Sequence, residues 1–332
     1  MSRIAATRRS TSTTATQNEG KVRGRVPLGR ISTNRLAHGP SIQKVSQQET
    51  LPSKHESTTH AIEPFHHVEV SIGDKEDPQD ITEFEHIIYR TLRAEEIAQK
   101  PLKFEQSDIT MRDRNLLIDA ICRYHYKLSL MTNTFYRFLG IFDRYLSVAH
   151  VSKSNLKLIG CACFLIASKI EDIYPAQSSD LIQLSERAFT RRELFAAEIK
   201  IVNAISFDTT FATPLFYLTQ LMRINGQTKE SLLLARYILE ICQSNEQFYG
   251  VMPAITASVA VMVTRLLKGD SKWTKELAGY TQLSEEQLYP YALIVRSMLL
   301  EEDREETKFM RRKYGSDLFL GVAHVHVPAN FK

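Results

Sequence analysis

The chain has 332 residues, enough for two domains, and its formal net charge is +4 at pH 7. The charge is unevenly spread, because residues 1–60 carry ten Lys and Arg against three Asp and Glu (net +7), whereas residues 61–332 carry 32 against 35 (net −3). A mildly acidic folded part argues against a nucleic-acid-binding domain, which usually has a basic face.

The four cysteines lie in helical patterns and lack the spacing of zinc ligands, as expected for small buried side chains in a reducing compartment: Cys122, Cys161, Cys163 and Cys242. No nucleophile and base pair, phosphate-binding glycine loop or metal cluster stands out. The N-terminus has no apolar core of signal-peptide length, and the eleven uncharged residues 158–168 are too few to cross a membrane. We therefore expect a non-catalytic protein of the nucleus and cytoplasm that uses no metal or cofactor and binds neither membrane nor nucleic acid.

Residues 1–75 are predicted to form a disordered basic tail. They are rich in Ser, Thr, Arg and Gln and cannot bury enough apolar surface to offset the entropy of ordering. Asp80-Ile-Thr-Glu83 then resembles a capping box. It opens a predicted amphipathic helix of about 18 residues, whose apolar stripe holds Ile81, Phe84, Ile88 and Leu92.

The rest of the chain is predicted to be all-α. The strict alternation of apolar and polar residues that marks a β-strand is almost absent from it. Five helices are expected between about residues 108 and 209, and Thr213-Pro214 interrupts the chain before a second helical set. Residues 158–169 and 254–265 are both nearly uncharged helices that end in a base, at an offset of 96 residues. This pattern indicates a duplicated architecture. The inner face of the second helix is predicted to hold Phe135, Phe138, Leu139, Phe142 and Leu146.

Two opposite charges lie on apolar helical stripes. Lys169 continues the stripe of Leu158, Ala162 and Leu165, while Glu198 shares a stripe with Leu194, Ile201 and Ile205 in a helix opened by the capping box Thr190-Arg-Arg-Glu193. An unpaired charge on a packed face is costly. Either the two charges pair inside a bundle, or both reach a partner protein.

These segments resemble the N-terminal cyclin fold of B-type (mitotic) cyclins. Arg114 and Asp119 match the first helix of that fold, Leu158 and Lys169 match the third, and Glu198 matches the fifth. Phe142-Asp143-Arg144-Tyr-Leu-Ser147 is similar to the signature that closes the second helix. A later set, residues 251–260 with Trp273, Leu277 and Tyr280-Thr281, resembles the second cyclin fold of the A and B classes.

The resemblance covers about residues 78–327 and implies two tandem five-helix cyclin folds preceded by a helix and a disordered tail. The expected domains are the tail at 1–75, the N-terminal fold with its leading helix at 76–209, and the C-terminal fold and tail at 210–332. In this family the leading helix packs across the first fold.

The resemblance also implies the function of a non-catalytic subunit that binds and activates a cyclin-dependent serine/threonine kinase to control G2/M. Lys169 and Glu198 would lie at the centre of the kinase-binding surface, with Glu171, Val202 and Phe207 beside them.

One surface departs from the family. The stripe that docks Arg-x-Leu peptides is Asp113, Leu116, Leu117 and Ala120 in this chain, where the family typically has Met first and Trp last, and Arg123 replaces an acid. Losing the aromatic removes contact area, and a like charge opposes a cationic ligand. We expect this patch to bind a different ligand or none.

In the tail, Arg25, Leu28, Ile31 and Asn34 look like a destruction box, with the Asn one position later than usual. Such an extended motif implies capture by a ubiquitin ligase of the anaphase-promoting type.

The alternative is a transcription-associated protein with the same double fold. A general transcription factor of this kind would carry a zinc ribbon and a basic second fold, and a transcription-kinase cyclin would have a divergent second fold. Tyr280-Thr281 and the tail motif favour cell-cycle control.

Overall fold

A computed structural model of the chain describes residues 84–226, 228–270, 273–301 and 304–328. Within these ranges the protein contains twelve α-helices, short 3-10 turns and no strand, so the predicted all-α class is confirmed. The predicted tail, the destruction-box residues and the capping box at residues 80–83 lie outside the described residues.

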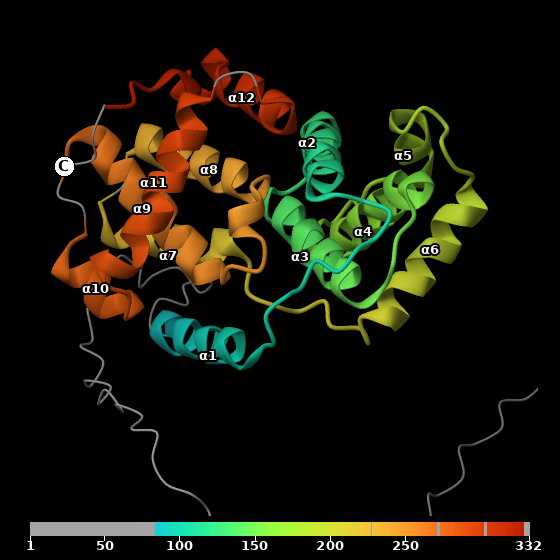
Figure 1. Cartoon of the computed structure of the whole chain (residues 1–332), viewed down its shortest axis with the longest axis horizontal. Helices are drawn as coiled ribbons and strands as arrows, with labels where there is room; N and C mark the ends of the chain where they lie inside the picture. Colours follow the sequence, from blue (N-terminus) through green and yellow to red (C-terminus); the bar gives the residue numbers. More distant parts are fainter. Residues whose placement is uncertain (1–83, 227, 271–272, 302–303, 329–332) are drawn as a thin grey trace, which may run out of the picture. The chain divides into compact units, whose positions relative to one another are not determined.

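The first helical set contains five helices, as predicted: α2 (Met111–Leu128), α3 (Thr132–Val148), α4 (Leu156–Glu171), α5 (Ser178–Leu184) and α6 (Arg191–Ala204). Helix α4 lies at its centre and packs against α2, α3 and α6 (Figure 1). Every residue from Ile159 to Ser168 is buried, so α4 is covered on all its faces. The predicted inner face of α3 is also buried throughout.

The second set repeats this plan with α7 (Pro214–Ile224), α8 (Lys229–Gln243), α9 (Pro253–Lys268), α10 (Lys275–Thr281) and α11 (Glu285–Leu300). Its central helix is α9, which packs against α7, α8 and α11. The two uncharged helices singled out in the sequence are therefore the centres of the two sets. Pro214 occupies the first turn of α7, where its missing N–H costs nothing.

The leading helix, α1 (Glu85–Ala98), has 14 residues and lies on the second set, beside α7 and α10 (Figure 1). The Tyr89 ring lies 5.3 Å from that of Tyr217 on α7 and 4.5 Å from that of Tyr280 on α10. Glu96 accepts a 2.9 Å hydrogen bond from the backbone N–H of Ala254, at the start of α9. The expectation that this helix packs across the first fold is therefore wrong for the described residues, because the side chains that find buried partners face α7, α9 and α10.

The predicted apolar stripe of this helix is also displaced. Tyr89 and Glu96 are its buried residues, whereas Ile88 and Leu92 are half-buried and Phe84 is 51% exposed. A large aromatic ring outweighs the smaller aliphatic side chains in deciding which face is covered.

Polar contacts that are at least partly buried join α2 to the second set and to the C-terminal helix α12 (Lys308–Tyr314), and two of the predicted fold-signature residues make them. Arg114 on α2 donates to both carboxylate oxygens of Asp143 on α3, at 2.7 and 2.6 Å, and to the Gln243 carbonyl at the end of α8, at 3.0 Å. Asp119 on α2 accepts from the backbone N–H groups of Phe309 and Met310 in α12. Leu158, another of the predicted fold-signature residues, is half-buried against the core.

Arg114 is 2% exposed, so removing it would leave the Asp143 carboxylate buried without its cation. We expect Arg114→Ala to lower the free energy of unfolding by about 3–5 kcal/mol, the usual cost of breaking a buried pair. Arg112→Ala is the matched control, because this neighbour pairs with Glu306 at the surface and should cost about 1 kcal/mol or less. Urea unfolding followed by circular dichroism measures both, and equal losses would contradict the structural role of the Arg114 pair.

Candidate functional site

Lys169 and Glu198 form a salt bridge between the last turn of α4 and the middle of α6. The capping box predicted at Thr190 and Glu193 opens α6 and fixes the register that points Glu198 toward α4. The Lys169 side chain is 47% exposed and that of Glu198 is 15% exposed. The two charges thus pair with each other while the ammonium remains open to solvent.

Large apolar side chains are exposed on the segments that carry this pair and on those that follow them. Ile173 is 91% exposed, Tyr174 87%, Phe207 67% and Ile199 64%. The Lys169 ammonium also lies 5.8 Å from the centre of the Phe195 ring. We call this set the apolar face: Lys169, Ile170, Ile173, Tyr174, Phe195, Glu198, Ile199 and Phe207. Clustered exposed apolar residues of this kind mark protein–protein contact surfaces.

Phe207 is held outward by the turn that ends α6. Ser206 and Phe207 both have left-handed backbone conformations, with φ of 52° and 59°. The Phe207 N–H donates to the Val202 carbonyl at 2.8 Å and closes the turn. Such a conformation costs a residue with a side chain about 1–2 kcal/mol. Val202, predicted to lie beside Phe207 in a binding surface, is half-buried against the core.

Glu171, the last residue of α4, points into the protein. Its carboxylate accepts a 2.6 Å bond from Arg137 Nε on α3, and both side chains are less than one-fifth exposed. The guanidinium of Arg137 also donates to the carbonyls of Thr209 and Phe211, at 3.0 and 2.7 Å, in the linker before α7. The structure therefore gives Glu171 an internal partner, although a kinase contact was predicted for it.

Sequence reasoning did not identify Arg137 or Phe211. The Phe211 ring lies close to two guanidinium groups, with its centre 4.8 Å from that of Arg137 and 3.7 Å from that of Arg144. Arg137, Gly140 and Arg144 are spaced three and four apart on one face of α3, and this spacing is the signal that could have revealed the site. Arg144, predicted as part of the fold signature, also contacts Asp208 at 3.2 Å and Gln99 at 2.7 Å.

The altered docking stripe is only partly at the surface. Asp113 caps α2 with Thr110 and pairs with Lys153 at 2.9 Å, and the Thr110 amide together with Lys153 lowers the pKa of Asp113 to about 2. Leu117 is 8% exposed and packs against Gly160 of α4. Leu116 and Arg123 are exposed, and Ala120 is half-buried. The ligand of this patch stays a prediction.

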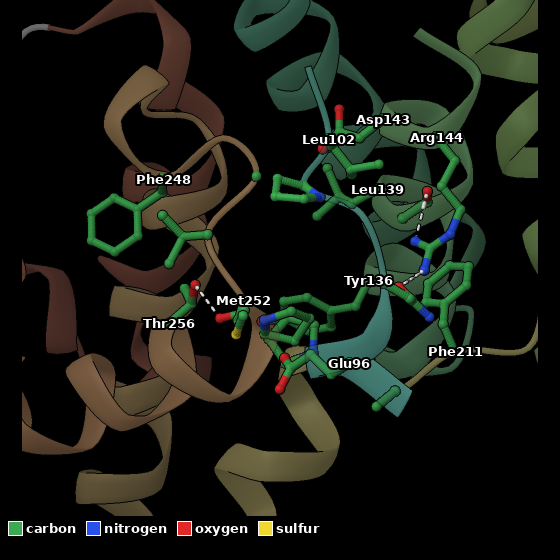
Figure 2. A pocket seen from close by; sticks show the side chains of 18 of the residues that line it. Glu96, Leu102, Tyr136, Leu139, Asp143, Arg144, Phe211, Phe248, Met252 and Thr256 are labelled. Carbon is green, nitrogen blue, oxygen red and sulfur yellow. Dashed lines mark hydrogen bonds between the residues drawn. The ribbon is translucent and has the colours of Figure 1, made fainter. Parts of the chain in front are cut away.

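A cavity of about 140 Å³ lies away from the apolar face, where α1, α3 and the loop before α9 meet. Figure 2 shows Glu96, Met252 and Thr256 on one side of it and Leu139, Arg144 and Phe211 on the other. Burial raises the pKa of Glu96, but its oxygens already accept from Ala254 and Arg93. We interpret the cavity as a packing space at the junction of the two sets.

In the described ranges, no three His, Cys, Asp or Glu side chains are grouped to hold a metal ion. None of the helices in those ranges is long and apolar enough to span a membrane.

Comparison with known proteins agrees with this architecture. Residues 67–210 match the family model of the cyclin N-terminal domain, and residues 212–328 match that of the cyclin C-terminal domain. A viral cyclin from herpesvirus saimiri, solved by X-ray crystallography, has a similar fold with a TM-score of 0.58 at 22% identity, over 64% of this chain and 97% of that chain.

Similar proteins include the G2/mitotic-specific cyclin-B of Patella vulgata, 26% identical over 77% of this chain and 64% of its own length. The G2/mitotic-specific cyclin-B1 of Anguilla japonica is 28% identical over 77% of this chain and 65% of its own. The chain thus spans slightly less than two-thirds of these relatives, and the predicted resemblance to B-type cyclins is confirmed. With matched N- and C-terminal domains that together cover most of its length, the chain belongs to the cyclin family.

Proposed function

We propose that this chain is a regulatory cyclin that binds and activates a cyclin-dependent serine/threonine kinase through the apolar face. It acts without catalytic chemistry of its own, in G2/M control, in the nucleus and cytoplasm. One observation carries the proposal: the segments that carry the Lys169–Glu198 pair and those that follow them expose large apolar side chains that no described part of the chain covers, and the Lys169 ammonium is itself open to solvent. Similarity to relatives named as G2/mitotic-specific supports the mitotic role.

The pair suits recognition of a partner's backbone. An ammonium carries three N–H donors, and Glu198 occupies one of them, so two remain for carbonyl oxygens. The salt bridge already restricts the long lysine side chain in the free protein, which reduces the entropy lost on binding. The apolar residues around it would exclude water and strengthen those bonds.

Activation then follows from selective binding. A kinase exchanges between arrangements, and a partner that binds only the active one raises its population by no more than the difference in affinity. An activating effect of a hundredfold thus requires about 2.7 kcal/mol of differential binding. An apolar face of several exposed side chains can supply that difference.

Lys169→Ala and Glu198→Ala test the binding role. Truncation at the centre of an interface typically costs about 2 kcal/mol or more, so we expect each variant to lower kinase activation about thirtyfold at limiting concentration. Stability should change by about 1 kcal/mol or less, because the pair is partly exposed. Histone phosphorylation by the purified kinase and urea unfolding measure the two effects.

The matched controls are Lys268→Ala and Glu230→Ala, which break a partly exposed 3.0 Å pair between α9 and α8. These variants should activate the kinase as well as the unchanged chain does. Undiminished activation by both Lys169→Ala and Glu198→Ala would refute the assignment of the apolar face.

The destruction-box proposal has a separate test. Arg25→Ala combined with Leu28→Ala should prolong the half-life of the chain several-fold in a cycling extract, because the ubiquitin ligase of the anaphase-promoting type would lose both its cationic and its aliphatic anchor. Arg8→Ala with Leu36→Ala alters the same residue types outside the motif and should leave decay unchanged. Decay of the Arg25 and Leu28 variant at the normal rate would remove the motif from the account.

A further inference from the structure

Two segments of the apolar face lie on either side of α6 in the sequence, and α6 itself supplies Phe195, Glu198 and Ile199. One is the end of α4 with the residues after it, which supplies Lys169, Ile173 and Tyr174. The other is the turn after α6, which supplies Phe207. A partner that contacts both segments requires them to keep a fixed spacing. The Lys169–Glu198 bridge joins α4 to α6 but does not reach the turn itself.

Arg137 contacts both segments at once. Its Nε donates to Glu171, two residues beyond Lys169, at 2.6 Å. Its Nη1 donates to the Thr209 carbonyl at 3.0 Å and to the Phe211 carbonyl at 2.7 Å. Thr209 lies two residues beyond Phe207. The Arg137 side chain is 12% exposed, so these charge-assisted bonds form largely out of water, where they are strongest.

The Phe211 ring fixes the other side of this contact. A Cβ atom added at Gly140 would lie 2.1 Å from a carbon of the ring, so the ring rests directly on the backbone of α3. The Arg144 guanidinium lies 3.7 Å from the centre of the ring, next to Phe211 in Figure 2, and contacts Asp208 in the same turn. Any side chain at position 140 would displace the ring and, with it, the carbonyls that Arg137 holds.

We propose that Arg137 is a positioning residue that sets the spacing between the two segments of the apolar face, with Glu171 orienting its guanidinium and Phe211 seating the linker. This inference rests on the proposed function for its biological meaning. The coupling itself is a property of the free chain and can be measured without any partner.

Hydrogen exchange of the free full-length chain tests the coupling. The reporters near α4 are the amides of Asp172 and Ala176, bonded to Ser168, and those in the turn are the amides of Asp208 and Thr209. Arg137→Gln should speed exchange about tenfold at both sites. In the unchanged chain local opening must break the charge-assisted bonds of Arg137, and in the variant it no longer has to. Lys268→Gln breaks a remote ion pair and should change neither site.

Glu171→Gln provides the decisive comparison. Glu171 makes no hydrogen bond to the turn in the described structure, so a purely local role would affect only the α4 reporters. If Glu171 orients Arg137, this variant should also speed exchange at Asp208 and Thr209. Arg137→Lys should retain protection at one site and lose it at the other, because a single ammonium cannot span both. Two results would overturn the proposal: unchanged exchange rates of the turn amides in Glu171→Gln, or faster exchange at only one of the two sites in Arg137→Gln.

Kinase binding separates this inference from the proposed function. Arg137→Gln should weaken binding about tenfold, through a faster dissociation rate, while Lys268→Gln binds normally. If Lys169→Ala leaves kinase binding intact while the exchange results appear as expected, the proposed function fails and the coupling stands. Normal kinase binding by Arg137→Gln, in a chain whose Lys169→Ala variant does lose binding, would refute the positioning role.

Discussion

Helix α4 is covered on all its faces, and the apolar face follows from that constraint. A helix packed against α2, α3 and α6 has only its ends available for other contacts. At its C-terminal end, Lys169 is paired by Glu198, Glu171 by Arg137, and Asp172 accepts from Met131 N–H and Thr134 Oγ at the start of α3. The charges that leave the core are thus attached to α6, in the case of Lys169, and to α3, in the case of Glu171 and Asp172. Ile173 and Tyr174 follow directly after these paired residues and are exposed to solvent.

The two helical sets are held together by buried polar groups as well as by apolar packing. Besides Arg114 and Asp119, Glu240 on α8 accepts from Lys313 and Tyr314 of α12, at 2.7 Å each, and lies 3.6 Å from the Cys122 sulfur on α2. Burial raises the pKa of Tyr314 and of Cys122 well above their ordinary values, and the nearby Glu240 carboxylate adds to both shifts. Both groups therefore stay protonated and can donate to Glu240. Satisfied contacts of this kind specify one arrangement of the sets.

Features that depend on local periodicity were predictable from the sequence. The two central helices, the inner face of α3, the capping box of α6 and Pro214 at the start of α7 are each encoded within a few helical turns. The pairing of Lys169 with Glu198 was one of two open readings, because spacing shows that two charges lie on packed faces but not whether they meet. Their kinase-binding role remains a prediction.

Features that depend on contacts between distant segments were not predictable in the same way. The predicted position of α1 was wrong. Contacts of Tyr89 and Glu96 place this helix on the second set, and their partners, Tyr217 and Ala254, lie more than a hundred residues away in the sequence. Phe211 was missed because it lies in a linker without helical periodicity, and Arg137 because its partners Glu171, Thr209 and Phe211 lie 34 to 74 residues away in the sequence. Leu117 was assigned to the docking stripe by its match to the family, yet its side chain is buried because it packs against Gly160 of α4.

The central claim is that the apolar face meets a kinase. Hydrogen exchange of the chain with and without a purified cyclin-dependent kinase tests it most directly, because the measurement maps contact without altering any residue. The account predicts slower exchange at residues 169–176 and 198–209 in the complex, with little change in α9 and α11. Protection confined to the second helical set, with residues 169–176 and 198–209 unaffected, would contradict it.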